Sequence, residues 1–351
     1  AKKLSIEKSS GLISDIDAVQ KLKDLEVFHM SNFAATVNPI SLAPLRQLTA
    51  LRELIITNSQ ICDTDTLRTL VNVESVSFEN SSINALGFLA SMPQLKKLNI
   101  AGNHHTFQNY DTLRALTDLQ LLDISENPQA TTENVEAFSD FSMLTNVNIS
   151  SCPLSSLSFL YSSASRLQTF EASNCPNISN FDLLMRASKL KKVNISNTEA
   201  KTITFAKNKV DLKDLRLANT KVESIEALVS SINMEWLDIS NTQVQDLSPL
   251  AGMTKLKRFY MPHCNAVTDV KPLAGCEALK VLDCSHSQLS SIEGLETCTN
   301  LSVIDLSKTM VTDLKPLFSA KKIERLTLDL HVETTAQQVQ LDVLKKRSPL
   351  I

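Results

Sequence analysis

One pattern of apolar and polar positions recurs along almost the whole chain. It reads apolar-x-x-apolar-x-apolar-x-x-small or polar, as in LKKLNIAGN from Leu95, LKKVNISNT from Leu190 and LSVIDLSKT from Leu301. Successive copies lie 22 to 26 residues apart, and this spacing predicts fifteen structural repeats across residues 1–331. The fourth-position apolar residues of the copies are Leu4, Phe28, Leu54, Val76, Leu98, Leu122, Val147, Phe170, Val193, Leu215, Leu237, Phe259, Leu282, Ile304 and Leu326.

A repeat of this length cannot bury its apolar positions by itself. Neighbouring repeats are therefore expected to stack and to share one continuous core, with one short parallel strand in each repeat. Because successive side chains of a strand point to opposite faces, the fourth and sixth positions are expected to face the core. The third, fifth and seventh positions then lie on the open face of the sheet.

These motifs, with later repeats such as VQDLSPLAGMTKL and VTDVKPLAGCEAL, resemble the leucine-rich-repeat superfamily over residues 1–331. The repeats are most similar to those of internalins and of the protein phosphatase 1 regulatory-subunit type. The resemblance implies an α/β solenoid, a horseshoe or arc of about 15 units, with a parallel concave sheet and short helices and 3-10 turns on the convex side. The ninth position departs from the family's usual Asn, because apart from Asn103 and Asn127 it is mostly Cys, Ser or Thr. These residues can still bond to backbone groups.

The segments between the strands predict two kinds of connection. DTDTLRTLV, YDTLRALTD and TTENVEAFSDF lie in long repeats and are expected to form short convex helices, with Asp or Thr available as N-caps. The shorter repeats from Leu212 onward leave no room for a helix. Pro249, Pro272 and Pro316 in these repeats indicate 3-10 or turn connections.

The repeat pattern stops near the C-terminus, where residues 332–351 are expected to form a capping helix. Thr335 and Gln338 have the spacing of a capping box, and Val339 and Val343 lie on one helical face. A helix at this place would cover the apolar edge that a solenoid otherwise exposes.

Composition narrows the class of partner. The chain has 35 Lys and Arg against 38 Asp and Glu, a net charge of 35 − 38 = −3, which argues against nucleic-acid binding. No run of 18 apolar residues occurs, so membrane insertion is not expected. The first residues, AKKLSIEKSS, also lack the apolar stretch of a signal peptide. We expect a monomer with a protein partner.

Seven cysteines occur without CxxC or His/Cys ligand spacing. Cys152, Cys175 and Cys264 are ninth-position residues and Cys284 is a sixth-position residue, so buried free thiols are expected. Free thiols favour a reducing compartment, and we expect a cytoplasmic protein that holds no metal. The five N-x-S sequons would matter only in a secreted protein.

A catalytic site would need a nucleophile, a base and an orienting acid that meet in one pocket. The nearest approach to such a cluster is His263 and His286, eighth-position neighbours near Asp283. No nucleophile elbow, phosphate-binding loop or metal motif accompanies them. We therefore predict no enzymatic activity, no catalytic residue and no cofactor.

Charged and small residues follow separate columns of the open strand face. Seventh positions are nearly all Ser, Thr or Ala. These small residues either leave a shallow groove along the sheet for a partner, or they are small because the chain begins to turn at this position. Fifth positions carry acids, and second and third positions carry many bases. These columns are either a solvated mixed-charge surface or a device that orients an acidic or mixed-charge partner segment.

The candidate binding site lies around Trp236, the one Trp of the chain. Trp, Tyr and Arg dominate interface hot spots, and these three residue types meet here on neighbouring repeats. The alternative is that Trp236 covers the aliphatic stems of its neighbours. The predicted partner-binding residues are Trp236, Asp238, Arg258, Tyr260, Arg216, His263, Val281 and Asp283.

The predicted function is a non-enzymatic protein–protein interaction scaffold or adaptor that binds its partner on the concave face. The family resemblance leaves two alternatives open, a regulatory subunit of a phosphatase or other enzyme, and an extracellular adhesin or receptor ectodomain. A second, smaller patch that could bind a partner is Val27 with Ile55.

Overall fold

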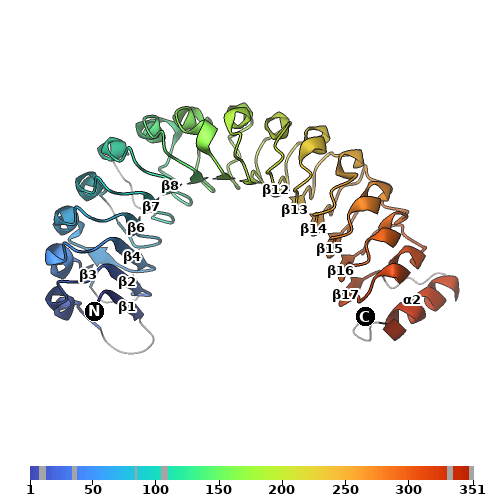
Figure 1. The fold of residues 1–351 in the computed structure, drawn as a ribbon, viewed down its shortest axis with the longest axis horizontal. Helices are drawn as coiled ribbons and strands as arrows, with labels where there is room; N and C mark the ends of the chain where they lie inside the picture. The colour runs from blue at the N-terminus through green and yellow to red at the C-terminus, as the bar shows by residue number, and fades with distance from the viewer. Residues whose placement is uncertain (8–12, 34–37, 84, 104–109, 330–334, 348–351) are drawn as a thin grey trace. The chain divides into compact units, whose positions relative to one another are not determined.

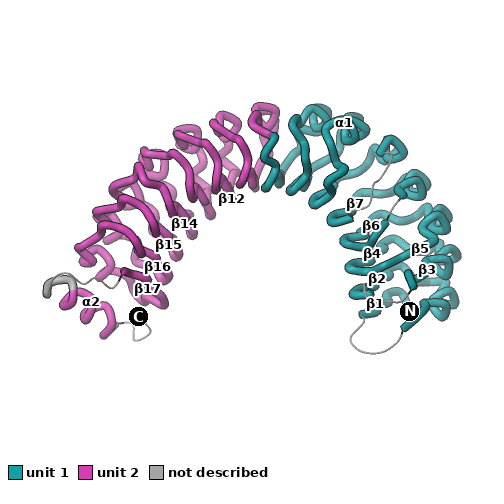
Figure 2. Tube along the Cα trace, turned by 180° about the vertical axis from the view of Figure 1, so that it is seen from behind, with its two compact units in different colours: residues 1–177 teal, residues 178–351 magenta. Residues whose placement is uncertain are grey.

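The structure, a computed structural model, describes the chain except for residues 8–12, 34–37, 84, 104–109, 330–334 and 348–351. Its internal contacts divide the chain into two compact units, unit 1 (residues 1–177) and unit 2 (residues 178–351), coloured separately in Figure 2. Both units are built from the same repeat. In each, short strands line one side and short helices line the opposite side (Figure 1).

Unit 1 carries parallel strands that pair in chain order. In its main sheet, the first three strands are five residues long and the later ones are three residues long. A separate parallel pair, β3 (Ile40–Ser41) with β5 (Ile61–Cys62), lies in the connections. The strands of the main sheet in this unit are β1 (Lys3–Glu7), β2 (Val27–Ser31), β4 (Glu53–Thr57), β6 (Ser75–Ser77), β7 (Lys97–Asn99), β8 (Leu121–Asp123), β9 (Asn146–Asn148) and β10 (Thr169–Glu171).

The strands of unit 2 are also parallel and paired in chain order. Trp236 lies opposite Arg258, and Arg258 lies opposite Val281. Equivalent repeat positions are therefore aligned from strand to strand, and each position forms a row across the unit. The strands are β11 (Lys192–Asn194), β12 (Asp214–Arg216), β13 (Trp236–Asp238), β14 (Arg258–Tyr260), β15 (Val281–Asp283), β16 (Val303–Asp305) and β17 (Arg325–Thr327).

The side opposite the strands is built mainly from 3-10 helices. Those of unit 1 are η1 (Asp17–Lys21), η2 (Ala43–Gln47), η3 (Thr64–Thr69), η4 (Gly87–Ser91), η5 (Tyr110–Ala115), η6 (Glu136–Phe138), η7 (Ser158–Leu160) and η8 (Ala164–Arg166). Those of unit 2 are η9 (Asp182–Arg186), η10 (Thr204–Ala206), η11 (Glu226–Ser230), η12 (Ser248–Leu250), η13 (Lys271–Gly275), η14 (Leu295–Thr297) and η15 (Lys315–Ser319). The expected 3-10 connections at Pro249, Pro272 and Pro316 are confirmed.

The three predicted convex helices differ from one another. DTDTLRTLV and YDTLRALTD form the 3-10 helices η3 and η5. A 3-10 helix rises about 2 Å per residue, so it spans the same length as an α-helix with fewer residues. TTENVEAFSDF forms the short α-helix α1 (Thr132–Val135), which continues into η6. Its N-cap is Thr131, whose hydroxyl accepts from the Asn134 N–H at 3.4 Å.

The core is a stack of fourth- and sixth-position side chains, as the pattern predicts. Leu237 and Ile239 in β13 are both 0% exposed, whereas Trp236 and Asp238 between and before them are half-buried. Leu4 in β1 and Leu326 in β17 are only half-buried, because each of these strands has a paired strand on one side only. The expected leucine-rich-repeat fold, α/β with parallel strands, is confirmed within each unit.

Two ladders of polar residues follow the strands. At the ninth position, Thr220 Oγ1 donates to the Leu217 carbonyl at 2.7 Å, and Cys175 Sγ donates to the Ile149 carbonyl at 3.1 Å. Asn103 Nδ2 donates in the same way to the Phe78 carbonyl at 2.7 Å. At the ninth position, Thr and Cys side chains therefore donate to backbone carbonyls as the Asn side chain does, which their chemistry allows.

The eighth position forms the second ladder, which the sequence analysis did not identify. Its backbone is left-handed, with φ of 57° at Asn197, 56° at Asn219 and 51° at Asn241. Asn tolerates this region better than most residues. Asn219 Nδ2 donates to Asn197 Oδ1 at 2.7 Å, and Asn241 Nδ2 donates to Asn219 Oδ1 at 2.8 Å. The turn conformation thus explains why Asn recurs one place earlier than the family pattern puts it.

All seven cysteines carry free thiols, and the sequence expectation of burial holds for six of them. The exception is Cys62 in β5, which is half-buried. Burial raises the pKa of Cys152 and Cys276 to about 12 and that of Cys298 to about 11. These thiols are therefore protonated at neutral pH and serve as small packing groups.

Helix α2 (Thr335–Arg347) lies at the C-terminal end of unit 2 and packs against η15. Leu341 and Leu344 are its buried residues, and the Gln340 side chain accepts from the Leu314 N–H at 2.7 Å. The expected apolar face was partly wrong, because Val339 is 57% exposed. The helix is rotated so that its leucines, with Gln340, face the last repeat.

We predict that α2 acts as a cap. Leu344→Ala should lower the free energy of unfolding by about 2–5 kcal/mol, because it leaves a cavity against the last repeat. Val339→Ala, on the exposed side of the same helix, should cost less than about 0.5 kcal/mol. Deletion of residues 332–351 should lower the thermal midpoint and favour association. Circular dichroism and size-exclusion chromatography check this, and an unchanged, monomeric truncated chain would mean that the segment is a tail.

We predict that all seven thiols are reduced in the native protein. Alkylation of the denatured, unreduced chain should add seven groups, counted by intact mass. In the native chain at pH 8, Cys62 should react first, because it alone is not fully buried. Reaction of Cys152 and Cys276 should stay slow as the pH rises toward 9, because thiols with a pKa of about 12 remain protonated there. A mass showing fewer than seven groups would indicate disulfides.

Candidate functional site

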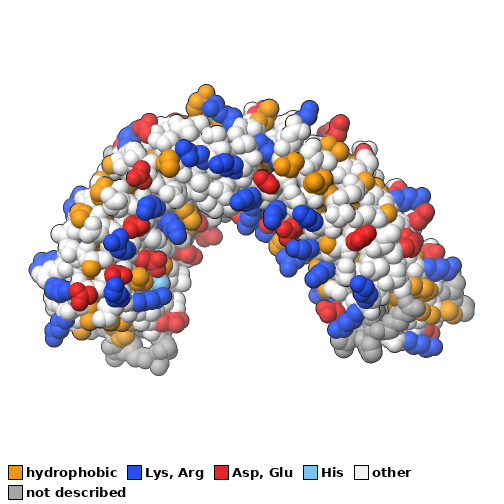
Figure 3. Space-filling model, in the orientation of Figure 1, with side chains coloured by type: hydrophobic (Ala, Val, Ile, Leu, Met, Phe, Trp, Pro, Cys, Tyr) orange, Lys and Arg blue, Asp and Glu red, His pale blue; other side chains and the backbone are white. Residues whose placement is uncertain are grey.

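A hollow of about 510 Å³ lies on the strand face of unit 2, at the N-terminal ends of neighbouring strands. Lys and Arg side chains gather over the part of the unit that carries β12 to β15 (Figure 3). The hollow is lined by second- and third-position residues, namely Lys213, Asp214, Glu235, Trp236, Lys257, Arg258, Lys280, Val281 and Ser302. Repeat register creates it, because equivalent positions of consecutive strands stand side by side.

Trp236 is the centre of an aromatic and cationic cluster. The Arg216 guanidinium lies 4.0 Å from the centre of the indole ring, and the Arg258 guanidinium lies 4.7 Å from it. The ring of Tyr260 is 6.0 Å away at an angle of 37°. Cation–π contacts of this kind contribute about 0.5–2 kcal/mol each, depending on burial. The indole is therefore held in place by its neighbours and is presented as part of a rigid surface.

The alternative, that Trp236 covers the aliphatic stems of its neighbours, stays a prediction beside the contacts described above. The contacts that define the cluster join the indole to two guanidinium groups and to one aromatic ring. The indole Nε1–H is buried and has no hydrogen-bond acceptor among the residues that the structure describes. An unsatisfied buried donor costs about 1–3 kcal/mol.

Two carboxylates in the hollow are already engaged. Glu235 accepts from Lys257 Nζ at 2.6 Å and lies 3.3 Å from Lys213 Nζ. These bonds, that of Lys257 first, lower the pKa of Glu235. Asp214 forms a bidentate pair with Arg216 at 3.0 and 2.9 Å. This pair holds the Arg216 guanidinium over the indole, and it also neutralises the Asp214 carboxylate, which lines the hollow.

The fifth-position acids have a structural task. Asp238 accepts from the Ser240 N–H at 2.9 Å and also from the Ser240 hydroxyl, and Asp283 accepts from the Ser285 N–H at 2.9 Å. Each carboxylate therefore closes the turn that leaves its strand. The small residues of the seventh position fit this turn, which supports the turn interpretation of that column over a groove for a partner.

His263 lies in the turn that follows β14. It occupies the eighth position with a φ of 60° and stacks on His286, with ring centres 4.5 Å apart. His is among the residues that tolerate the left-handed region, so the backbone explains its presence in that place. The structure thus brings Trp236 together with Arg216, Arg258 and Tyr260. Asp238 and Asp283 are the register partners of Tyr260 on the two adjacent strands, although their carboxylates bond to the turns that follow. Val281 is the register partner of Arg258.

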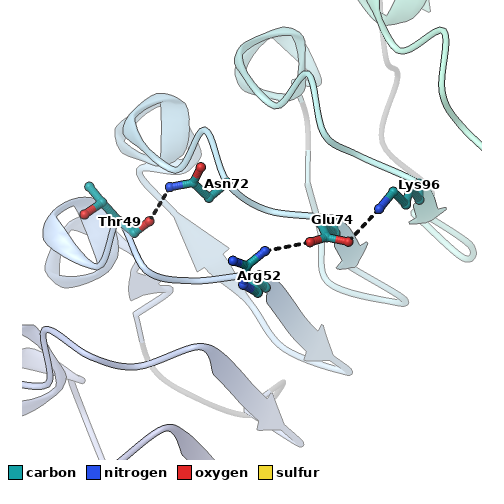
Figure 4. Close-up of polar contacts among 5 residues, drawn as sticks. All are labelled: Thr49, Arg52, Asn72, Glu74 and Lys96. Atoms are coloured by element: carbon teal, nitrogen blue, oxygen red, sulfur yellow. Dashed lines mark hydrogen bonds and ion pairs between the residues drawn. The ribbon is translucent and has the colours of Figure 1, made fainter.

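The second patch, in unit 1, has a different character. Val27 and Ile55 are half-buried, and between their strands His29 Nε2 lies 2.6 Å from Glu53 Oε1. The edge of the same sheet carries a charge ladder in which Arg52 and Lys96 both contact Glu74 at 2.8 Å (Figure 4). Exposed pairs of this kind add little stability. The apolar surface of Val27 and Ile55 is therefore interrupted by polar and charged side chains.

The same hydrogen bond, from an Asn side chain to a backbone carbonyl of the preceding repeat, occurs in both units. Asn72 Nδ2 donates to the Thr49 carbonyl at 2.9 Å (Figure 4), and Asn233 Nδ2 donates to the Val210 carbonyl at 2.9 Å. Such bonds tie the connection of one repeat to that of the preceding repeat. The strand starts, and hence the second- and third-position side chains, are held at fixed spacing.

Neither a metal-ligand cluster nor a membrane-spanning helix occurs in the part of the chain that the structure describes. No group of three or more His, Cys, Asp or Glu residues there is arranged to hold a metal ion. Of the described helices, none has the length and apolar character needed to span a bilayer.

The sequence located the aromatic cluster, and it missed two carboxylates. Trp236, Arg216, Arg258 and Tyr260 were predicted together, and the structure brings them together. Asp214 and Glu235, which neutralise part of the basic edge, were not singled out. The sequence places Asp214 at the third and Glu235 at the second position of their repeats. It does not predict their hydrogen bonds, because these depend on side-chain geometry.

We predict that Asp238 matters more for stability than for display of a binding surface. Asp238→Ala removes an acceptor that is bonded to a backbone N–H and a hydroxyl, and it should cost about 1–3 kcal/mol in the free energy of unfolding. Asp211→Ala, an exposed acid outside the turn, should cost less than about 0.5 kcal/mol. Chemical denaturation checks this, and equal effects of the two substitutions would contradict a role in the turn.

Comparisons with known proteins agree on the fold. A family model described as Leucine Rich repeats (2 copies) matches residues 277–319. The structure of an internalin, InlF from Listeria monocytogenes, is 19% identical, with a TM-score of 0.71 and 87% of both chains covered. A leucine-rich-repeat protein from Leptospira interrogans is 13% identical, with a TM-score of 0.72, over 99% of this chain and 94% of that one.

A third structure is the functional domain of InlJ from Listeria monocytogenes, described as including a cysteine ladder. It is 19% identical, with a TM-score of 0.64, over 81% of this chain and 64% of that one. A search of curated protein sequences found no match. At these identities the structures establish the fold and leave the partner open. The chain therefore has the leucine-rich-repeat fold, which it shares with the internalin structures, and residues 277–319 match a leucine-rich-repeat family model.

Proposed function

We propose that this protein is a non-enzymatic scaffold or adaptor that binds a protein partner on the strand face of unit 2. The observation that carries the proposal is the half-buried Trp236, with the guanidinium groups of Arg216 and Arg258 at 4.0 and 4.7 Å and with Tyr260 beside it. Trp, Tyr and Arg are the residue types that carry most binding energy in protein interfaces.

Rigidity of the surface supports this proposal. The cluster stands on consecutive strands whose core side chains, such as Leu237 and Phe259, are fully buried. Asp214 fixes Arg216, so the guanidinium does not have to be ordered on binding. A preorganised surface loses less conformational entropy when a partner binds, which increases affinity for a given area.

Two further aspects belong to the same proposal. The near-neutral net charge of −3 supports a protein partner over a nucleic acid. The free thiols support a reducing, cytoplasmic location and a monomeric chain without intermolecular disulfides. Regulation of a phosphatase or another enzyme through this surface is a second candidate, favoured by the same anchor residues and by the sequence resemblance of the repeats.

We predict that Trp236→Ala/Tyr260→Ala abolishes most partner capture. Loss of a hot-spot anchor typically costs about 2 kcal/mol or more, which is about thirtyfold in affinity. Quantitative affinity purification with mass spectrometry from matched lysates, followed by titration of the captured protein, measures the effect. Proteins that the double variant loses are the candidate partners, and a metal-dependent phosphatase among them would favour the regulatory role.

The control is Ser150→Ala, which changes a small residue on the strand face of unit 1. Both variants should keep the wild-type circular dichroism spectrum, because the substituted side chains point away from the core. Wild-type affinity of the double variant for every captured protein would contradict the proposal. Val27 and Ile55 would then be the next surface to test.

A further inference from the structure

We propose that unit 2 recognises an extended acidic segment of its protein partner, which lies along the third-position row of β14 to β17. That row consists of Arg258, Val281, Val303 and Arg325, aligned strand by strand. The inference rests on the proposed function and adds the chemistry of the ligand, namely two carboxylate side chains with an apolar side chain between them.

The balance of paired and unpaired charge carries the inference. Of the residues that line the hollow, Lys213, Lys257, Arg258 and Lys280 are cationic, whereas Asp214 and Glu235 are anionic. Both anions already hold cations, Glu235 those of Lys213 and Lys257, and Asp214 that of Arg216.

The remaining cations lie at one end of the hollow and beyond it. Arg258, Lys280 and Arg325 form no ion pair with any residue that the structure describes. Arg258 begins β14 and Lys280 directly precedes the adjacent strand β15, and both are exposed. Their unneutralised charges favour an anionic ligand, since complementary charge both attracts and orients a partner.

The spacing of the row sets the spacing of the ligand. Arg258 and Arg325 are separated by three strand intervals, through Val281 and Val303. At about 4.8 Å per interval this is about 14 Å, which an extended chain covers in about four residues. Side chains of an extended segment alternate between two faces, so residues i, i+2 and i+4 would all face the row.

The apolar centre of the row fits the middle residue of such a segment. Val281 and Val303 are half-buried and stand between the two arginines, so they can contact an aliphatic side chain at position i+2. Carboxylates at i and i+4 would then reach the cationic ends, Arg258 with Lys280 on one side and Arg325 on the other.

The neighbouring fifth-position row restricts the segment to this path. In β15 and β16 that row carries Asp283 and Asp305, whose carboxylates accept from the N–H groups of Ser285 and Ser307 at 2.9 Å. These anions repel a second acidic side chain. An acidic segment is therefore favoured along the third-position row and disfavoured along the fifth.

The test uses the full chain and a fluorescein-labelled peptide, Gly-Ser-Glu-Ser-Leu-Ser-Glu-Ser-Gly, in fluorescence anisotropy titrations. Binding is expected at about 0.05 M salt, with affinity falling about tenfold or more by about 0.5 M salt, where charges are screened. Arg258→Gln/Arg325→Gln should weaken binding by about tenfold or more. The matched control, Lys207→Gln/Lys315→Gln, removes two exposed charges on the opposite side and should change affinity less than about twofold.

Comparison peptides test whether binding requires the two carboxylates and their spacing. Gln in place of both Glu residues, or Glu residues two positions apart, should weaken binding by about tenfold. Equal binding of either peptide, or no binding of the Glu peptide at about 1 mM, would overturn the inference. A phosphoserine peptide that binds more than about tenfold tighter would assign the site to phosphate and overturn the carboxylate assignment. Circular dichroism confirms that the variants are folded.

Failure here is distinguishable from failure of the proposed function. If the acidic peptide does not bind while partner capture still depends on Trp236 and Tyr260, the surface stands and the acidic-segment inference is wrong. If capture is independent of both aromatic residues, the proposed function fails whatever the peptides do.

Discussion

Stacking of equivalent side chains between neighbouring strands is the interaction on which the rest of this structure depends. A three-residue strand has too few hydrogen bonds and too little apolar surface to be stable by itself. Burial of the fourth- and sixth-position side chains joins each strand to the next, at a gain of about 25 cal/mol per Å² of apolar surface removed from water. Each repeat is stable because its neighbours cover it, which explains why the outermost strands β1 and β17 carry half-buried apolar residues.

The turn that leaves each strand is a second repeated constraint. Its fifth, seventh, eighth and ninth positions act together, as in Asp238, Ser240, Asn241 and Thr242. The acid accepts from the serine, the asparagine takes the left-handed backbone, and Thr242 Oγ1 donates to the Ile239 carbonyl at 2.7 Å. Fixing this turn also fixes the strand, and therefore the spacing of the side chains on the open face.

Surface chemistry is built on that fixed spacing. Because register holds from strand to strand, a substitution at one repeat position places the new side chain beside known neighbours on two strands. Trp236 and Arg258 are register partners, and Arg216 reaches the same indole from the other adjacent strand. Charge pairing within the second and third positions then decides which cations remain for a ligand. The fold supplies the positions, and the side chains supply the specificity.

The sequence by itself determined the repeat, the strands, the buried positions and the meeting of Trp236 with Arg258 and Tyr260. These follow from a period of about 22 residues and from alternation along a strand, which are properties of the chain alone. The sequence also indicated the buried thiols, because Cys152 and Cys264 fall on ladder positions.

Only the tertiary structure determined which groups the polar side chains contact. That Asp238 closes a turn, that Glu235 is held by Lys257, and that His263 stacks on His286 all depend on rotamers and on distances of a few ångströms. It also decided that Leu341 and Leu344, and not Val339, face the last repeat. Repeat period fixes where a side chain starts, whereas its hydrogen bonds depend on neighbours that are distant in the chain.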